Sequence, residues 1–320
     1  MTKVSVIMGV YNGGGLLRDA LASILADGFH DLEVIVVDDG STDETPEILR
    51  AVADPRLKVF RQQNAGLAAA LQRGLSAAQG IYIARADADD LSLPGRFEAQ
   101  SRFLDENPDV DVLATAFHII DANSKLIATQ TLPSGPRIHR ALQTGNPICH
   151  GSVMMRKEAL VGVGGYDPTL RYAQDFDLWL RMRAAGKRFE ALEAAYYAHR
   201  VTPISLGKTA HQAKYAAYTL ARHQGRAVTA PPQQSSSGNG RGRQFAYLYH
   251  LGTWASIGGD QAEARHLLLK SIRARPHSAR AWYRLMTTLL PIRQRRWLAS
   301  VVPAARLYLR ARRVATRGDE

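Results

Sequence analysis

Three carboxylates lie within four residues in the segment Asp87-Ala88-Asp89-Asp90, directly after an apolar run typical of a buried strand. Neighbouring carboxylates repel one another, so we expect a fold to keep such a group where a cation compensates it. Hard divalent cations prefer oxygen ligands, and Mg²⁺ is commonly bound through one or two carboxylates together with substrate phosphates. The alternative is a solvated loop that caps the next helix. The spacing therefore favours a divalent cation site without excluding a plain loop.

A second acidic group follows another apolar run, in the segment Asp38-Asp39-Gly40-Ser41-Thr42-Asp43. A carboxylate here could accept hydrogen bonds from a base N–H or from ribose hydroxyls. The alternative is a turn and a helix N-cap, which explains the last three residues but not two aspartates after a β-branched run. The glycines of residues 9–15 (GVYNGGG) would let the backbone approach a ligand closely, although this segment is neither a dinucleotide fingerprint nor a P-loop.

These polar segments follow strands that alternate with helices. The apolar patterns predict strands at residues 4–8, 32–37, 57–60 and 81–84, and helices at 16–25, from Ser41 or Thr42 to Arg50, and at 66–79. Strands separated by helices of this length indicate βαβ units and a mainly parallel sheet. Ligands of such sheets bind at the carboxyl ends of the strands, where all three polar segments lie. Residues 111–205 mix short strands, Gly-rich turns and one helix near 176–185.

Four segments in this order resemble glycosyltransferase family 2. They are VSVIMGVYN at residues 4–12, VIVVDDGSTDET at 34–45, ADADD at 86–90 and QDFDLWLRM at 174–182. The resemblance spans about residues 1–220. It implies an α/β fold of the GT-A type, with a Rossmann-like, mainly parallel sheet flanked by helices. It also implies direct transfer of a sugar from a nucleoside diphosphate, with inversion at the sugar carbon.

The resemblance implies how the donor would be held. Tyr11 and Asp39 would contact the nucleotide base, and Gly9 and Val10 would shape its pocket through their backbone. Asn64 belongs to a further, partial match to the donor-binding residues of the family.

The resemblance also implies a metal site. Asp87 would hold the ribose or a metal-bound water, and Asp89 would ligate the Mg²⁺ or Mn²⁺ that bridges the diphosphate. That cation would neutralise the charge that builds on the departing diphosphate. His199, in a partial match to a family element near the diphosphate, would ligate the metal or bind phosphate; a plain surface histidine is the alternative.

The base of the reaction is expected in Gln174-Asp175-Phe176-Asp177. By the resemblance, Asp175 would deprotonate the acceptor hydroxyl, with an N-cap of the following helix as the alternative role. The family usually has Glu where this chain has Gln174, and loss of that neighbouring charge should lower the pKa of Asp175. Trp179 is expected in the core, with a sugar platform as the alternative.

The character of the sequence changes at residues 229–243 (TAPPQQSSSGNGRGR), which are too poor in apolar residues to pack. We therefore expect a catalytic domain at residues 1–228, a linker at 229–243 and a basic α-helical region at 244–320. Within that region, residues 247–276 resemble one tetratricopeptide-type helical hairpin, and one or two such units cannot form a solenoid.

The positive charge of the chain belongs to this C-terminal region. Residues 241–320 carry 16 Lys and Arg and 4 Asp and Glu, a surplus that equals the formal net charge of +12 of the whole chain. Near the end, arginines alternate with apolar residues: Arg293, Arg295, Arg296, Arg306, Arg310, Arg312 and Arg313. This pattern is typical of a helix that lies on an anionic membrane surface. A solvated helix is the alternative, and no nucleic-acid partner is expected because no reader motif is present.

Composition narrows the protein class. The chain has 320 residues, 46% of them hydrophobic, and a single cysteine, Cys149, so it cannot form an intrachain disulfide. It contains no apolar run of about 18 residues that would predict a membrane-spanning helix. We expect a cytoplasmic protein, peripheral to the inner face of the membrane if the basic tail binds there.

Together these features predict a metal-dependent, inverting glycosyltransferase. The donor would be a nucleoside-diphosphate sugar, with UDP as the favoured carrier, and the acceptor a saccharide or a lipid-linked molecule, as in bacterial surface polysaccharide synthesis. Two alternatives stay open at this point. One is a sugar nucleotidyltransferase, and the other is an inactive protein of the same fold that binds partners through its helical tail.

Overall fold

The computed structural model describes residues 2–203, 209–228, 240–290 and 294, which fall into two compact units. The first unit contains the described residues of Met1–Phe117, Leu132–His199 and Gln212–Pro232, and the second contains those of His118–Thr131, Arg200–His211 and Gln233–Glu320. The predicted linker therefore lies largely outside the described residues, and the domain boundaries stay a prediction.

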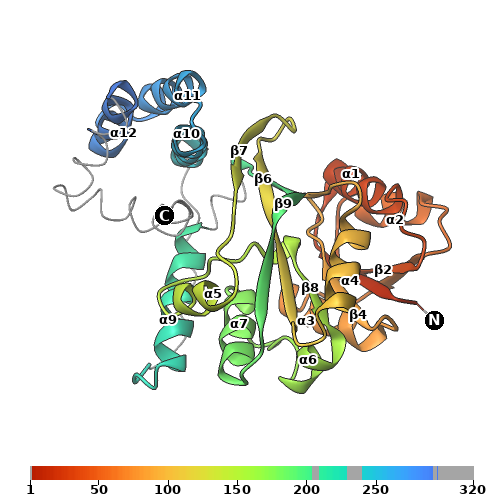
Figure 1. Cartoon of the computed structure of the whole chain (residues 1–320). Coiled ribbons are helices and arrows are strands. Elements are labelled where there is room, and N and C mark those ends of the chain that lie inside the picture. The colour runs from red at the N-terminus through yellow and green to blue at the C-terminus, as the bar shows by residue number, and fades with distance from the viewer. Residues whose placement is uncertain (1, 204–208, 229–239, 291–293, 295–320) are drawn as a thin grey trace. The chain divides into compact units, whose positions relative to one another are not determined.

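A nine-stranded sheet with the order β3-β2-β1-β4-β8-β6-β9-β5 organises the fold, and β7 pairs with β6 (Figure 1). The strands are β1 (Val4–Val10), β2 (Leu32–Asp38), β3 (Leu57–Arg61), β4 (Tyr82–Arg85), β5 (Leu91–Ser92), β6 (Val112–Ile120), β7 (Leu126–Gln130), β8 (Met154–Arg156) and β9 (Phe189–Arg200). β3, β2, β1 and β4 are parallel to their neighbours, whereas β8 is antiparallel to both β4 and β6, and β5 is antiparallel to β9. The sheet is thus mixed, and its parallel part is formed by strands from the N-terminal part of the chain, as predicted.

β1, β2 and β4 are buried on both faces, which explains why their sequences are largely apolar, whereas β3 at the edge of the sheet is partly exposed. Because side chains alternate along a strand, Ile7, Ile35 and Val37 enter one core, while Val6 and Val36 enter the other. The first core is covered by α3 (Leu67–Ala77), α5 (Pro136–Ala141), α6 (Lys157–Gly162), α7 (Gln174–Ala184) and α9 (Thr209–His223). The second is covered by α1 (Gly14–Leu25), α2 (Thr45–Ala51) and α4 (Arg96–Glu106).

The register of the parallel strands aligns their carboxyl ends. Val10 at the end of β1 pairs with Asp38 at the end of β2, and Asp38 pairs with Arg61 at the end of β3. Arg85 at the end of β4 pairs with Ile7. The loops that follow β1, β2 and β4, which carry the predicted site residues, therefore leave the sheet at one edge.

Two local predictions need correction or refinement, and a third is confirmed. Helix α2 begins at Thr45, and neither Ser41 nor Thr42 caps it, because Asp43 accepts the hydrogen bond from the Thr45 N–H instead. Residues 111–205 contain two long strands, the 9-residue β6 and the 12-residue β9, in addition to short ones. Trp179 is 0% exposed and belongs to the core, as expected.

The second unit contains three helices among its described residues, α10 (Gly240–Gly258), α11 (Gln261–Ala274) and α12 (Ala279–Leu289). Helix α10 starts inside the stretch predicted as a linker. Gly252 allows α10 and α11 to approach closely, since a Cβ there would lie 2.8 Å from Leu268 Cγ. Leu268 and Leu285 form the centre of a small core.

The arginine-rich end of the chain lies outside the described residues, so its predicted membrane contact stays a prediction. Within the described residues, none of the helices is both long enough and apolar enough to span a bilayer.

Candidate active site

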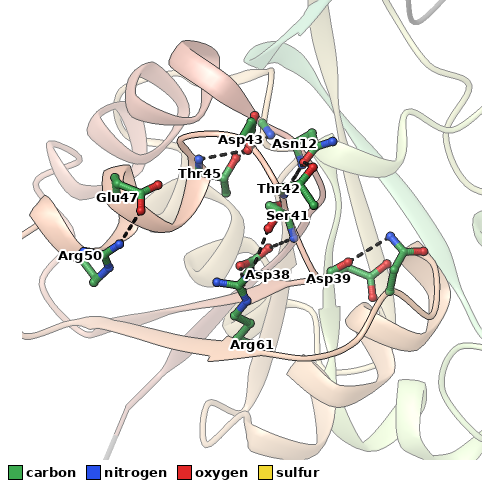
Figure 2. A network of polar contacts seen from close by, with 12 residues as sticks. Asn12, Asp38, Asp39, Ser41, Thr42, Asp43, Thr45, Glu47, Arg50 and Arg61 are labelled. Carbon is green, nitrogen blue, oxygen red and sulfur yellow. Dashed lines mark hydrogen bonds and ion pairs between the residues drawn. The ribbon is translucent and has the colours of Figure 1, made fainter.

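The loops after β1 and β2 are tied together by a polar network at the edge of the sheet (Figure 2). The Ser41 N–H donates to Asp38 Oδ1 at 2.8 Å, and Arg61 Nε lies 3.5 Å from Asp38 Oδ2. The Asn12 N–H donates to Ser41 Oγ, and the Thr42 N–H donates to Asn12 Oδ1, both at 2.9 Å. Asp38 therefore closes the turn, a role that the sequence interpretation did not assign to it.

Asp39 fixes the loop that precedes α3. Its carboxylate accepts three hydrogen bonds of 2.8 Å, from Gln62 Nε2 and from the backbone N–H groups of Ala65 and Gly66. Asn64 Nδ2 donates to the Asp39 backbone carbonyl at 3.0 Å. A carboxylate offers about four lone-pair positions, so Asp39 keeps acceptor capacity for one more donor such as a base N–H.

The other residues predicted to hold the nucleotide base lie at the end of β1 and directly after it, beside the loop that Asp39 fixes. The side chain of Tyr11 is 53% exposed at the end of β1, and the Val10 carbonyl accepts the Asp39 N–H at 2.8 Å. Close packing also favours glycine at position 9, because a Cβ there would come within 2.8 Å of Leu67 Cδ1 on α3. The structure thus brings Gly9, Val10, Tyr11, Asp39 and Asn64 to one edge of the sheet, and their contact with a nucleotide stays a prediction.

The turn after β4 pairs two of its carboxylates with cations. Arg85 Nη2 donates to Asp87 Oδ1 at 2.5 Å, although the Arg85 side chain is only 1% exposed. Burial alone would raise the pKa of Asp87, but the Arg85 guanidinium together with His150 and His199 outweighs burial and holds that pKa below its ordinary value. At the other end of the turn, Asp90 Oδ2 lies 3.1 Å from His199 Nδ1 on β9. Burial opposes charge on His199, yet Asp90 raises its pKa to about 9.

Asp89 lies between these two pairs and is half-buried. Burial, followed by the charges of Asp90 and Asp87, raises its pKa to about 7. No cluster of three or more His, Cys, Asp or Glu side chains within the described parts of the chain is already arranged around a metal position. An oxygen ligand in such an acidic environment nevertheless suits a hard divalent cation, which would lower that pKa and complete its own coordination with substrate phosphates.

Asp175 lies in the first turn of α7, a position where the helix N-terminus favours a carboxylate. Asn146 Nδ2 donates to Asp175 Oδ2 at 2.7 Å. Burial nevertheless keeps the pKa of Asp175 above its ordinary value, and the charge of Asp87 adds to this. The residue before the helix, Ala173, has a φ of 57° and is itself the N-cap, so Asp175 does not cap α7.

Two buried side chains, His150 and Tyr166, are affected by the charge of Asp87, and Tyr166 is also affected by that of Asp175. His150 Nε2 lies 2.9 Å from the Tyr166 hydroxyl. Burial, together with the charge of Arg85, lowers the pKa of His150 to about 3, so its ring is neutral. Burial also raises the pKa of Tyr166, and Asp175 and Asp87 both contribute to that rise. No local pattern marks Arg85, Asn146 or His150 as site residues, because the contacts that they make form only in the folded chain.

Residues 5–163 match the family described as Glycosyl transferase family 2. EpsE of Bacillus subtilis is 39% identical over 201 residues, which is 61% of this chain and 72% of EpsE. The chain belongs to glycosyltransferase family 2. Another family relative is the amylovoran biosynthesis glycosyltransferase AmsE of Erwinia amylovora, 32% identical over 57% of this chain and 70% of AmsE.

Solved structures agree with the fold of this family 2 glycosyltransferase. S. aureus TarS 1–349 aligns with a TM-score of 0.56 at 21% identity, over 89% of this chain and 84% of TarS 1–349. The mannosyltransferase PcManGT from Pyrobaculum calidifontis, solved with GDP-Man and Mn²⁺, aligns with a TM-score of 0.57 at 20% identity, over 99% of this chain and 88% of PcManGT. TarS 1–349 was also solved with UDP-GlcNAc. At these identities the likeness establishes the GT-A fold, as predicted, and the fold alone.

Proposed function

We propose that this family 2 protein is an inverting glycosyltransferase that takes a sugar from a nucleoside-diphosphate donor, with UDP favoured as the carrier. The acceptor is a hydroxyl of a saccharide or a lipid-linked molecule in surface polysaccharide synthesis. One observation carries the proposal: the register of β1, β2 and β4 brings the loops that carry Tyr11, Asp39 and Asp89 to one edge of the sheet. Burial is the main cause of the raised pKa of both Asp89 and Asp175, and the charge of Asp87 adds to it in each case.

The donor and its cation are assigned to the edge of the sheet. Tyr11, Asp39 and Asn64 hold the base end of the donor, and Asp87 holds its ribose or a metal-bound water. Asp89 holds Mg²⁺ or Mn²⁺, which would supply positive charge to the departing diphosphate. His199 is the second metal ligand in this proposal. Its Nδ1 faces Asp90, and a metal-binding histidine commonly uses its other ring nitrogen in this way.

Asp175 takes the proton of the acceptor hydroxyl. The acceptor oxygen forms a bond to the anomeric carbon as the bond from that carbon to the diphosphate oxygen breaks, and the electron pair leaves with the diphosphate. Because attack and departure occur on opposite faces, the configuration inverts. A carboxylate whose pKa is raised accepts a proton more readily than an ordinary one at neutral pH.

The names of two similar proteins support the proposed role in polysaccharide synthesis and the proposed UDP-linked donor. AmsE is named for amylovoran biosynthesis, and TarS was solved with UDP-GlcNAc. Family membership favours sugar transfer over nucleotidyl transfer. The basic segment near the C-terminus, whose structure is not described, is proposed to hold the protein at an anionic membrane surface, close to a lipid-linked acceptor.

A thermal-shift screen tests the donor and cation assignments. UDP-sugars and GDP-Man are added with Mn²⁺ or with EDTA, and one donor should stabilise the protein in Mn²⁺, by about 2.7 kcal/mol at 100 times Kd. Asp89→Ala should lose the part of this stabilisation that depends on Mn²⁺, whereas Asp19→Asn, an exposed residue on α1, should keep it. Failure of every donor to stabilise the protein, or full Mn²⁺-dependent stabilisation of Asp89→Ala, would overturn the assignment.

A further inference from the structure

The side chain of Asn146 contacts the proposed base from a loop that is 29 residues away in sequence. The loop joins α5 to the short 3-10 helix at His150–Ser152. Asn146 Nδ2 lies 2.7 Å from Asp175 Oδ2, within the range of a charge-assisted hydrogen bond. Asp175 is half-buried and Asn146 is exposed, so solvent reaches the contact from the Asn146 side.

The backbone of the same loop fixes the orientation of this amide. The Ile148 N–H donates to Asn146 Oδ1 at 3.1 Å. A flipped amide would place its NH₂ group against the Ile148 N–H and its oxygen against the Asp175 carboxylate. Both contacts would be repulsive, so Nδ2 must face Asp175.

The hydrogen bond also distinguishes the two oxygens of the carboxylate. Oδ2 accepts from Asn146, and the Phe176 backbone N–H also bonds to the carboxylate, which keeps lone pairs to accept a proton from an acceptor hydroxyl. The helix is held at its start by Ala173, in the left-handed backbone region, whose carbonyl accepts the Asp177 N–H at 3.0 Å. The base therefore has a fixed backbone and one fixed oxygen.

We propose that Asn146 is a positioning residue of the base: it orients the Asp175 carboxylate toward the acceptor. This inference rests on the proposed function, in which Asp175 is the base. Asn146 does not itself exchange a proton with the substrate. Its effect is to restrict rotation of the half-buried Asp175 side chain, whose carboxylate also forms a hydrogen bond with its own helix backbone through Phe176.

The titratable groups that face Asp175 set the expected pH behaviour. Asp87 from the turn after β4 and Tyr166 from the turn after α6 both act on it electrostatically. Burial and Asp87 raise the pKa of Asp175, and the hydrogen bond from Asn146 lowers it. Removal of the donor should therefore raise this pKa, and a second carboxylate at position 146 should raise it further.

Three variants separate positioning from a general disturbance of the loop. Asn146→Ala removes the donor, and Asn146→Asp keeps the shape but replaces the donor with a like charge. Thr144→Ala is the matched control, because Thr144 lies in the same loop as Asn146 and its hydroxyl donates to the Ala141 carbonyl at the end of α5. The measurements are kcat and KM against pH with the donor found in the screen. In addition, the Asp175 carboxyl is titrated by NMR in protein labelled at the aspartate side chains, with Asp175→Asn used for assignment.

Asn146→Ala should lower kcat about tenfold with unchanged KM for the donor, as expected for a lost hydrogen bond to a charged group. The acid limb of kcat and the NMR titration should both move to higher pH, further in Asn146→Asp, and stay in place in Thr144→Ala. An inactive Asp175→Asn protein combined with wild-type profiles in both Asn146 variants overturns the role of Asn146 alone. A fully active Asp175→Asn protein overturns the proposed base instead, so the two failures are distinguishable.

Discussion

Arg85 and Asp87 form an ion pair in which the cation is almost completely buried, with Nη2 2.5 Å from Oδ1 and the Arg85 side chain 1% exposed. The Nε and Nη1 groups of Arg85 find no hydrogen-bond partner among the described residues. Loss of that one ion pair would leave a buried, uncompensated charge, which is strongly destabilising. Arg85 therefore compensates the charge of Asp87, and His199 compensates that of Asp90. Asp89, between them in the sequence, has a pKa of about 7.

Arg85→Met should destabilise the protein, because it leaves the Asp87 charge without its main partner. Asp87 is 31% exposed, so solvent screens part of the loss, and we expect about 2 kcal/mol. The double variant Arg85→Met/Asp87→Asn should recover part of it. Urea unfolding at pH 7 measures both. Arg50→Met, which breaks a solvent-exposed pair with Glu47, is the control and should cost less than about 0.5 kcal/mol. Equal losses in the two single variants would contradict this account.

Asp177 should make stability depend on pH in acid. Burial would raise its pKa, but hydrogen bonds with His223 at 2.9 Å and Arg181 at 2.8 Å outweigh burial and lower it. A lowered folded pKa gives stability that is present above the unfolded value of 3.8 and is lost as the pH falls through the folded value. Asp177→Asn should therefore cost about 2 kcal/mol at neutral pH and progressively less below pH 4. Unfolding free energies from pH 2.5 to 7 test this, and a gap that stays constant over the range would refute it.

Ala173→Gly should stabilise the protein. Ala173 has a φ of 57° and a ψ of 25°, where a Cβ is strained and glycine is not. The gain, reduced by the greater freedom of glycine in the unfolded chain, should be about 0.5–1 kcal/mol. The same substitution at Ala217, an exposed residue inside α9, should instead cost about 1 kcal/mol. The free energies of unfolding of both variants are measured by chemical denaturation. Destabilisation by Ala173→Gly would show that the backbone at residue 173 is not strained.

The crossing of α10 and α11 should reject a methyl group. A Cβ at Gly252 would lie 2.8 Å from Leu268 Cγ and 3.2 Å from the Ala264 carbonyl oxygen. Gly252→Ala should therefore destabilise the second unit by about 1 kcal/mol or more, despite the better helix propensity of alanine. Gly15→Ala on α1, where no atom lies within 4 Å, should be neutral or stabilising. A higher melting temperature for both variants, measured by thermal unfolding, would contradict the close approach of α10 and α11.

Local patterns were sufficient for the parallel half of the fold. Strands β1, β2 and β4 are largely apolar and end at polar turns, so their apolar runs are enough to locate them, and the short run in β3 locates that edge strand. The lengths of β6 and β9 could not be predicted in the same way. Their partners are distant in sequence, and antiparallel pairing across the sheet, rather than local preference, determines where they end.

The same distinction applies to the site. Asp87 and Asp89 are visible because carboxylates cluster locally, and Asp175 because its segment resembles the family. The residues that tune them carry no local signal: Asn146 lies 29 positions from Asp175, and His199 lies 109 positions from Asp90. Gln174 removes one charge beside the base, yet burial still raises the pKa of Asp175, a contribution that depends on the folded environment.

The measurement that tests the central claim most directly is transfer by Asp175→Asn, with the donor from the screen and Mn²⁺. The substitution keeps the shape of the side chain and removes its ability to accept a proton. We expect donor affinity to stay at the wild-type value, while the rate of transfer falls at least about 100-fold. Turnover near the wild-type rate, with donor affinity also unchanged, would contradict the account.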